Sequence, residues 1–295
     1  MMKLIADSGS TKTDWMLIDN SEGDVENGWT QAYDGLTTVC VTTQGINPFH
    51  QESAAIYAIL RDELLPLLQG VGDSSTDIRE VYFYGSGVRP ELEPVMCELL
   101  SRVFPMSKIE VHSDLLGAAI AVCGDRPGLA CILGTGANSC LFDGRSIVAN
   151  TPPLGYILGD EGSGAVLGAR FLNALLKGFL QRSLRDEFFE TFGMTEADVI
   201  ARVYRQPLAN RFLASLSPFV HRHIGDPDVN EIVVGNFRDF FRRNLTQYGR
   251  RDLPVGAVGS VAWHYRTQLV QAAEEEGYRV GNVLRSPLDG LMRRQ

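Results

Sequence analysis

The chain has 295 residues, of which 44% are hydrophobic and 21% are charged. This length exceeds that of most single domains and the composition is that of a folded protein, so we expect two domains, each with its own core. The formal net charge of −9 excludes a surface built for nucleic acid or an anionic membrane, because such surfaces need clustered Lys and Arg. The expected ligand is therefore a small molecule.

The N-terminal segment lacks the features of a targeting signal. Asp7 interrupts the sequence before an apolar stretch can develop, and no run of 18 apolar residues occurs in the chain. We therefore expect a cytoplasmic protein. The five cysteines are odd in number and include no Cys-x-x-Cys pair, which predicts reduced thiols, mostly in the core, rather than disulfides or a metal cluster.

A strand, a glycine-containing turn and a second strand open the chain. Residues 4–6 and 15–18 are rich in apolar strand formers, and residues 7–13 between them (DSGSTKT) predict a turn. Residues 53–68 and 92–103 then carry apolar side chains at helical spacing, with β-rich residues between these two segments. The first half is therefore mixed α/β.

The opening pattern returns in the second half of the chain. Residues 130–133 and 140–142 predict strands around a second turn at residues 134–138 (GTGAN), with Gly9 and Gly136 in equivalent places. An internal duplication is the simplest explanation. We place the domain break near Ser113, which gives a first domain of residues 1–113 and a second of residues 114–284. Residues 285–295 are a tail that we expect to pack back on the first domain.

The remainder of the second half is predicted to be mostly helical. Helices are expected over residues 164–180 and 229–248, with a capping box at Thr195 between them. A strand at residues 255–258 enters the turn Gly259-Ser260, followed by helix over 261–276, which is a common geometry for contact with a mononucleotide. Residues 286–295 predict a final amphipathic helix.

The two equivalent turns are candidates for phosphate binding. Paired turns of this kind would present backbone N–H groups to phosphates, and hydroxyl groups would add donors without charge, from Ser8, Ser10, Thr11, Thr13 and Thr135. Neither turn has the spacing of a P-loop or a dinucleotide-binding motif. A single such turn is usually a plain hairpin, whereas two in register, together with Gly259-Ser260, favour a polyphosphate clamp.

These motifs carry a family resemblance. Residues 7–13 resemble the first phosphate motif of the actin, hexokinase and heat-shock-chaperone ATPase superfamily, and residues 133–138 resemble the second. Residues 155–164 (GYILGDEGSG) narrow the resemblance to the N-acetylglucosamine kinase and BadF/BadG/BcrA/BcrD ATPase family. The resemblance implies two duplicated α/β domains of the ribonuclease H-like, actin-like ATPase fold, with an active-site cleft between them that closes over Mg-ATP.

The resemblance also implies a set of ligand contacts. Nucleotide contacts fall on the first turn, on the second turn and on two further turns of the second domain: Ser8, Gly9, Ser10, Thr11, Lys12, Gly134, Thr135, Gly136, Gly225, Gly259 and Ser260. Sugar contacts fall on Asn47, Asp114, Thr135 and Asp160. Gly225 is equally well explained as a turn at a helix boundary.

Two aspartates match the family's reactive positions. Asp114 matches the catalytic base that accepts the proton of the sugar hydroxyl as it attacks the γ-phosphate. Asp7 matches the residue that holds Mg²⁺, usually through water. The alternatives are a helix N-cap for Asp114 and a local turn bond for Asp7.

The sequence departs from the family pattern at three places. Ser8 stands where glycine is usual, which narrows the approach of the β-phosphate, and Leu154 stands where animal kinases carry a tryptophan near the sugar. The cysteines that hold an iron–sulfur cluster in the dehydratase-activator branch are absent. The last departure favours a kinase over a redox activator.

We therefore expect an ATP- and Mg²⁺-dependent kinase of amino-sugar metabolism that phosphorylates N-acetylglucosamine or a close amino sugar, and the family resemblance implies the 6-hydroxyl as the acceptor. The expected partner is the sugar alone, without nucleic acid or membrane, and a homodimer remains an open alternative to a monomer. Two rival functions are an ATPase coupled to a protein partner and a catalytically idle sensor of nucleotide or sugar.

Overall fold

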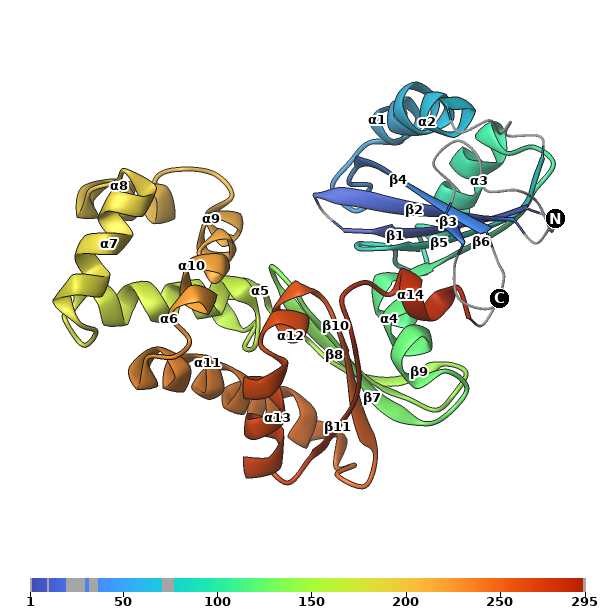
Figure 1. The fold of residues 1–295 in the computed structure, drawn as a ribbon. Coiled ribbons are helices and arrows are strands. Elements are labelled where there is room, and N and C mark those ends of the chain that lie inside the picture. The colour runs from blue at the N-terminus through green and yellow to red at the C-terminus, as the bar shows by residue number, and fades with distance from the viewer. Residues whose placement is uncertain (1, 10, 20–29, 32–36, 71–76, 294–295) are drawn as a thin grey trace. The chain divides into compact units, whose positions relative to one another are not determined.

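The protein folds into two compact units (Figure 1). The structure is a computed structural model, and it describes residues 2–9, 11–19, 30–31, 37–70 and 77–293. Unit 1 contains Met1–Gly117 and Pro287–Gln295, and unit 2 contains Ala118–Ser286. Each unit is built on its own sheet, with six strands in the first and five in the second.

The sheet of unit 1 is centred on β1 (Met2–Ser8). This strand pairs antiparallel with β2 (Lys12–Asp19) and parallel with β5 (Ile78–Gly85). The strand order is β3-β4-β2-β1-β5-β6. The outer strands are β3 (Thr30–Gln31), β4 (Thr37–Gln44) and β6 (Lys108–Ser113). Since β1 is central, its carboxyl end at Asp7 and Ser8 lies between two paired neighbours.

The sheet of unit 2 repeats this pattern. Its central strand β7 (Gly128–Leu133) pairs antiparallel with β8 (Ala137–Phe142) and parallel with β10 (Pro254–Val258). The outer strands are β9 (Ile147–Thr151), antiparallel to β8, and β11 (Arg279–Leu284), parallel to β10. The order β11-β10-β7-β8-β9 matches β6-β5-β1-β2-β4 of unit 1 in position and direction. The predicted duplicated α/β fold is confirmed.

The helices of unit 1 pack with its sheet and with each other. Residues 53–70 are helical throughout, as predicted, but the middle turn is a π-helix. The bounds are α1 (Ser53–Ala58), a π segment (Ile59–Leu64), α2 (Leu65–Gly70), α3 (Glu93–Val103), α4 (Asp114–Cys123), which continues into unit 2, and α14 (Leu288–Leu291). The predicted helix over residues 286–295 is wrong in length, because only the four residues of α14 are α-helical among the described ones, and they pack on β1.

The remaining helices belong to unit 2. They are α5 (Gly155–Leu158), α6 (Gly164–Leu176), α7 (Arg182–Phe192), α8 (Glu196–Tyr204), α9 (Ala209–Ser215), α10 (Ser217–Arg222), α11 (Pro227–Phe240), a π segment (Phe241–Leu245), a 3₁₀ turn (Thr246–Tyr248), α12 (Ser260–His264) and α13 (Arg266–Glu275). The Thr195 capping box is confirmed. Helix α6 ends four residues earlier than predicted, because Gly178 adopts a left-handed conformation (φ 77°).

Two separate hydrophobic cores stabilise the units. Trp15 and Phe83 pack in the core of unit 1, with ring centroids 5.9 Å apart, and a Phe-rich cluster around Phe171 fills unit 2. Among the described residues, no helix is both long enough and apolar enough to cross a membrane. All five cysteines are unpaired, but only Cys131 and Cys140 are buried, so the expectation that most lie in the core is wrong.

Candidate active site

The first predicted phosphate turn joins β1 to β2. The N–H of Gly9 donates to the carbonyl of Lys12 (3.0 Å), which closes the turn. The N–H of Thr11 donates to no described residue, and Gly9, Thr11 and Lys12 are exposed. Ser10 lies outside the described residues. The turn therefore offers at least one backbone donor in the geometry that suits an anion.

The hydroxyl groups of Ser8 and Thr13 serve the fold of unit 1. Both side chains are fully buried, and their oxygens lie 2.6 Å apart. Ser8 also donates to the carbonyl of Ile46 and accepts from its N–H, and Thr13 donates to the carbonyl of Gln44. In this structure both hydroxyls therefore form bonds that hold residues 44–46 against the turn, and neither is exposed toward a ligand.

The Lys12 side chain lies along the same hairpin. Its ammonium group forms an ion pair with the Asp14 carboxylate at 2.5 Å. Asp14 also accepts from the hydroxyl of Thr42 on the neighbouring strand β4. The Lys12 side chain is 64% exposed, so the pair is weak and can be exchanged for another anion.

Two carboxylates of unit 1 lie close enough to influence each other. Burial, then the negative charges of Asp114 and Asp14, raise the pKa of Asp7 to about 7, against a smaller lowering by Lys12. Burial raises the pKa of Asp114 to about 6, although N–H groups that include that of Leu115 (2.8 Å) lower it. No ion pair joins Asp7 or Asp114 to a cation in the described part of the chain. These two acids are poised to bind a cation or a proton.

The donor set at these aspartates fits Mg²⁺. Magnesium binds through one or two carboxylates and keeps most of its water ligands, so a dedicated cage of protein ligands is not required. The described residues contain no group of three or more His, Cys, Asp or Glu side chains suited to a metal ion. Asp7, with its mainly buried carboxylate and its raised pKa, would hold the ion, which would in turn favour ionised Asp114.

The N-cap position of α4 is occupied by Ser113, not by Asp114. Ser113 precedes α4, and its hydroxyl accepts from the N–H of Leu116 (3.3 Å), as a helix N-cap does. Asp114 is the first residue of α4. A Cβ on Gly117 would lie 2.8 Å from the Tyr84 ring, so glycine lets this first turn approach β5 closely. The N-cap alternative therefore belongs to Ser113.

Asn47 is buried in a tight loop that follows β4. Its side-chain oxygen accepts from the N–H of Phe49 (3.0 Å), and a Cβ on Gly87 would lie 2.1 Å from that oxygen. Gly87 has a φ of 76°, so glycine is needed there for both its conformation and its size. The side-chain NH₂ of Asn47 donates to no described residue.

The second predicted phosphate turn joins β7 to β8 in unit 2. The N–H of Gly134 donates to the carbonyl of Gly136 (3.0 Å), whereas those of Thr135 and Gly136 donate to no described residue. The amino end of α6 is bonded to this turn. The N–H of Gly164 donates to the carbonyl of Gly134, and the N–H of Ala165 donates to the carbonyl of Thr135. Thr135 is exposed, so its hydroxyl and its N–H can both reach a ligand.

Asp160 lies directly against the second turn. A Cβ on Gly136 would be 3.2 Å from the Asp160 carboxylate. Asp160 has a left-handed backbone (φ 56°), and Gly159 before it could carry no side chain, because a Cβ would meet the Pro153 carbonyl at 2.1 Å. Such strained residues concentrate at functional sites. The fold thus places a carboxylate beside the turn at a cost in backbone energy.

The charge state of Asp160 is also perturbed. Burial raises its pKa to about 6, the N–H of Ala137 lowers it, and the charge of Glu161 raises it. Glu161 itself lies 3.6 Å from the guanidinium of Arg243. Asp160 accepts a hydrogen bond from the backbone of Ala137, and no ion pair joins it to a cation within the described residues.

The Gly259 turn packs on the second phosphate turn. Gly259 has a φ of 114°, and a Cβ there would meet the Leu133 carbonyl at 2.4 Å and the Gly134 nitrogen at 3.3 Å. Ser260 is exposed beside it. The structure therefore brings together two segments separated by more than 120 residues, which are both predicted to contact nucleotide. Gly225 is exposed between α10 and α11, with open space around its Cα.

One residue of this site was missed by sequence reasoning. Asn236 of α11 is fully buried and bonds to the segment that follows Asp160. Its only signal in the sequence is a lone polar side chain among the apolar residues of a predicted helix. That pattern does not reveal which backbone groups it would satisfy.

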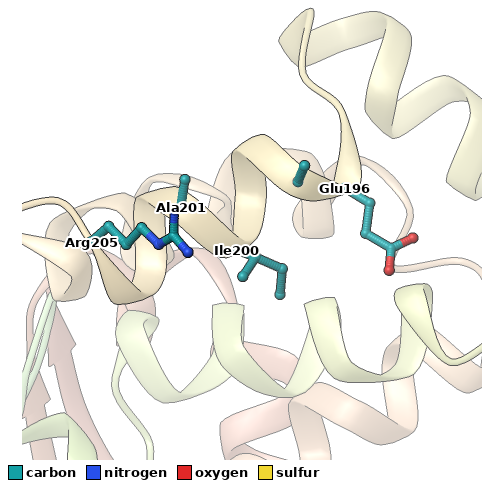
Figure 2. Close-up of a pocket in the computed structure, with 5 residues that line it drawn as sticks. Glu196, Ile200, Ala201 and Arg205 are labelled. Carbon is teal, nitrogen blue, oxygen red and sulfur yellow. The ribbon is translucent and has the colours of Figure 1, made fainter.

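Two surface cavities of unit 2 are lined by none of the predicted site residues. One, of 470 Å³, follows α8 and is lined by Glu196, Ala197, Ile200, Ala201 and Arg205. Figure 2 shows Ile200 and the Glu196 carboxylate on the same side of this helix. Glu196 pairs with Arg185 at 2.9 Å, so its charge is already matched. The other, of 380 Å³, includes Tyr156 and Arg170.

Comparison with known proteins decides the family. No family model matches the chain. The crystal structure of a candidate N-acetylglucosamine kinase from Porphyromonas gingivalis is 48% identical, with a TM-score of 0.88 over 99% of this chain and 97% of that one. The chain belongs to the N-acetylglucosamine kinase-like ATPase family. The resemblance predicted from the two turns and from residues 155–164 is thereby confirmed.

Two further members or neighbours of this family are similar to the chain. A candidate N-acetylglucosamine kinase from Chromobacterium violaceum shares the fold at 20% identity, with a TM-score of 0.70 over 100% of this chain and 99% of that one. The N-acetylmuramic acid/N-acetylglucosamine kinase of Clostridium acetobutylicum is 29% identical over 175 residues. That match covers 55% of this chain and 55% of the relative, so it spans about half the length of the curated protein.

Proposed function

We propose that this chain transfers the γ-phosphoryl group of Mg-ATP to the 6-hydroxyl of N-acetylglucosamine or a close amino sugar. The observation that carries the proposal is the pair Asp7 and Asp114, two interacting carboxylates beside the first phosphate turn whose pKa values are raised to about 7 and 6. The similarity to proteins named as N-acetylglucosamine kinases supports the substrate class.

Asp114 has the properties of a general base. A base works best when its pKa lies near the operating pH, and a value of about 6 leaves it ionised at pH 7 yet more basic than an ordinary carboxylate. It would take the proton of the sugar hydroxyl as the hydroxyl oxygen bonds to the γ-phosphorus. The bond between that phosphorus and the oxygen of the leaving ADP breaks in the same displacement.

The remaining residues would bind and orient the two substrates. The backbone N–H groups of Thr11, Thr135 and Gly136 would hold phosphate oxygens, which costs no reorganisation because the turns are already formed. Asn47 in unit 1 and Asp160 in unit 2 would bond to sugar hydroxyls. The proposal therefore assigns one phosphate turn and one of these two sugar-binding side chains to each unit, and the two units are the proposed ATPase domains.

Bound Mg²⁺ would neutralise phosphate charge that develops during transfer. Asp7 would orient that ion through its water ligands, and this role explains why a carboxylate is buried beside Asp114 without an ion pair to a cationic side chain among the described residues. We also propose that the protein acts on amino sugars in the cytoplasm, where ATP is available.

A coupled assay of ADP release tests this function. The native protein is incubated with Mg-ATP alone and with N-acetylglucosamine, glucosamine or glucose. ADP release that requires an amino sugar supports the kinase. Equal release in all cases would favour the partner-coupled ATPase, and nucleotide binding without release would favour the sensor.

A further inference from the structure

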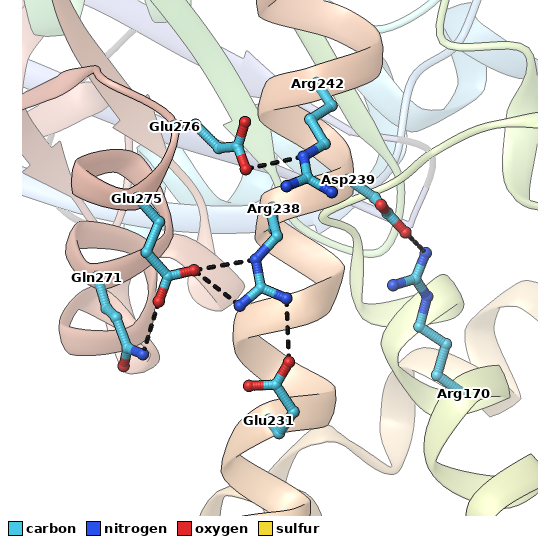
Figure 3. Close-up of polar contacts among 8 residues, drawn as sticks. All are labelled: Arg170, Glu231, Arg238, Asp239, Arg242, Gln271, Glu275 and Glu276. Carbon is cyan, nitrogen blue, oxygen red and sulfur yellow. Dashed lines mark hydrogen bonds and ion pairs between the residues drawn. The ribbon is translucent and has the colours of Figure 1, made fainter.

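Helix α11 is fixed in unit 2 by ion pairs on two of its sides (Figure 3). Arg238 bonds to Glu275 of α13 at 2.7 Å and to Glu231 of its own helix at 3.0 Å. Asp239, the next residue of α11, pairs with Arg170 of α6 at 2.6 Å, and Arg242 in the π segment that continues α11 bonds to Glu276, which directly follows α13. These contacts hold α11 against both α13 and α6, so a side chain on its buried face has a well-defined position.

Asn236 lies on that buried face, with no exposed surface. Its side-chain oxygen accepts from the N–H of Gly162 (3.2 Å), and its side-chain NH₂ donates to the carbonyl of Ser163 (3.1 Å). Gly162 has a φ of 83°, and a Cβ there would lie 3.0 Å from Phe240 of the same helix. The loop therefore packs directly on α11, and one side-chain amide bonds to backbone groups of two consecutive residues, the N–H of Gly162 and the carbonyl of Ser163.

The segment bonded by Asn236 connects the two proposed ligand-binding parts of unit 2. On one side, the N–H of Ser163 donates to the carbonyl of Asp160 (3.0 Å). On the other, Gly164 and Ala165 donate to the carbonyls of Gly134 (2.8 Å) and Thr135 (3.2 Å). A shift of Ser163 would therefore displace both the sugar-binding carboxylate and the phosphate turn.

We propose that Asn236 is a positioning residue that sets Asp160 and the Gly134–Gly136 turn at a fixed spacing. This inference rests on the proposed function, because it concerns the sugar and nucleotide contacts of the same site. Asparagine suits the role because it offers one donor and one acceptor on a short side chain. Leucine supplies neither, and an ionised aspartate supplies only acceptors, one of which would face the Ser163 carbonyl.

The test compares Asn236→Leu and Asn236→Asp with Val229→Ala, a control in the buried face of the same helix two turns away. Asn236→Leu should raise the KM for N-acetylglucosamine and the KM for Mg-ATP together by roughly tenfold or more, since small displacements at such sites have large effects. Val229→Ala should lower Tm and leave both KM values near those of the native protein. Unchanged KM values in Asn236→Leu would overturn the inference.

Asn236→Asp allows a measurement, the pH dependence of KM, that a general loss of stability would not change. Its carboxyl group can donate to the Ser163 carbonyl only when it is protonated, so its KM values, taken relative to the native protein at the same pH, should approach native values as the pH falls. A ratio independent of pH would contradict the positioning role. This variant also covers the case in which Asn236→Leu fails to fold.

Hydrogen–deuterium exchange of backbone amides separates this inference from the proposed function. If the native protein phosphorylates no amino sugar, the proposed function fails, but the exchange rates of the amides of residues 162–166 still measure how well the loop is held. These amides should lose protection in Asn236→Asp at neutral pH and keep it in Val229→Ala. Equal protection in both variants would overturn the inference whatever the activity.

Discussion

Replacing Asp114 by asparagine should remove activity and at the same time stabilise the protein. The native pKa of about 6 lies above the ordinary value of 3.8, so the folded state holds the proton more tightly than the unfolded state. The stabilising contribution of Asp114 is therefore fully present below about pH 4 and is lost as the pH rises through 6. Asparagine does not ionise and avoids this loss.

The size of the effect follows from the shift. About two pKa units correspond to at most about 3 kcal/mol of unfolding free energy at pH 8. Asp114→Asn should therefore raise Tm by several degrees at pH 8, and the gain should disappear near pH 4. Loss of the general base should lower kcat by roughly 10²-fold or more, with nucleotide affinity nearly unchanged.

The assay measures unfolding by calorimetry across pH 4 to 8 and kcat in the coupled reaction, with Asp143→Asn as the matched control. Asp143 accepts from the N–H groups of Ser146 and Arg145, which lower its pKa, so the same chemical change should there lower Tm at pH 8 and leave kcat unchanged. A native-like kcat in Asp114→Asn, or a Tm that falls at pH 8, would refute the reasoning.

Three further substitutions test the ligand contacts. Thr135→Val keeps the volume but removes a hydroxyl, so Mg-ATP binding should weaken by about 1 to 2 kcal/mol, and calorimetry showing native affinity would count against the two-turn clamp. Asp160→Ala should reduce affinity for N-acetylglucosamine while ATP binding without sugar changes little, because the Asp160 carboxylate is assigned to the hexose. An equal loss of affinity for both ligands would contradict that assignment. Gly259→Ala should lower both Tm and nucleotide affinity, because the alanine Cβ would meet the Leu133 carbonyl at 2.4 Å and the backbone φ at this position is 114°. A native Tm together with native nucleotide affinity would show that the turn can move without cost.

The sequence was informative where local chemistry determines structure. Glycines flanked by short apolar strands predicted both hairpins, and the repetition of that pattern predicted the duplicated sheets. The Thr195 capping box is similarly local, since a threonine and an aspartate three residues apart satisfy each other's backbone. Helix ends were less well predicted, because Gly178 stops α6 where the apolar spacing still continues.

The sequence was uninformative where a side chain's partner lies far along the chain. Ser8 and Thr13 look like phosphate ligands in a Gly/Ser/Thr turn, but the loop at Ile46 occupies their hydroxyls. Asn236 acts through a loop more than 70 residues away, which no spacing rule connects to it. Raised pKa values are likewise a property of tertiary burial, so Asp7 and Asp114 appear as ordinary aspartates until the fold is known.

The most direct test of the account is the chemical identity of the product. The native protein is incubated with Mg-ATP and N-acetylglucosamine labelled with carbon-13 at carbon 6, and the reaction is followed by nuclear magnetic resonance. The account predicts that the carbon-6 signal is split by coupling to phosphorus and that one sugar phosphate forms for each ADP. ADP formed without a phosphorylated sugar, or phosphorus coupled to a different carbon, would contradict it.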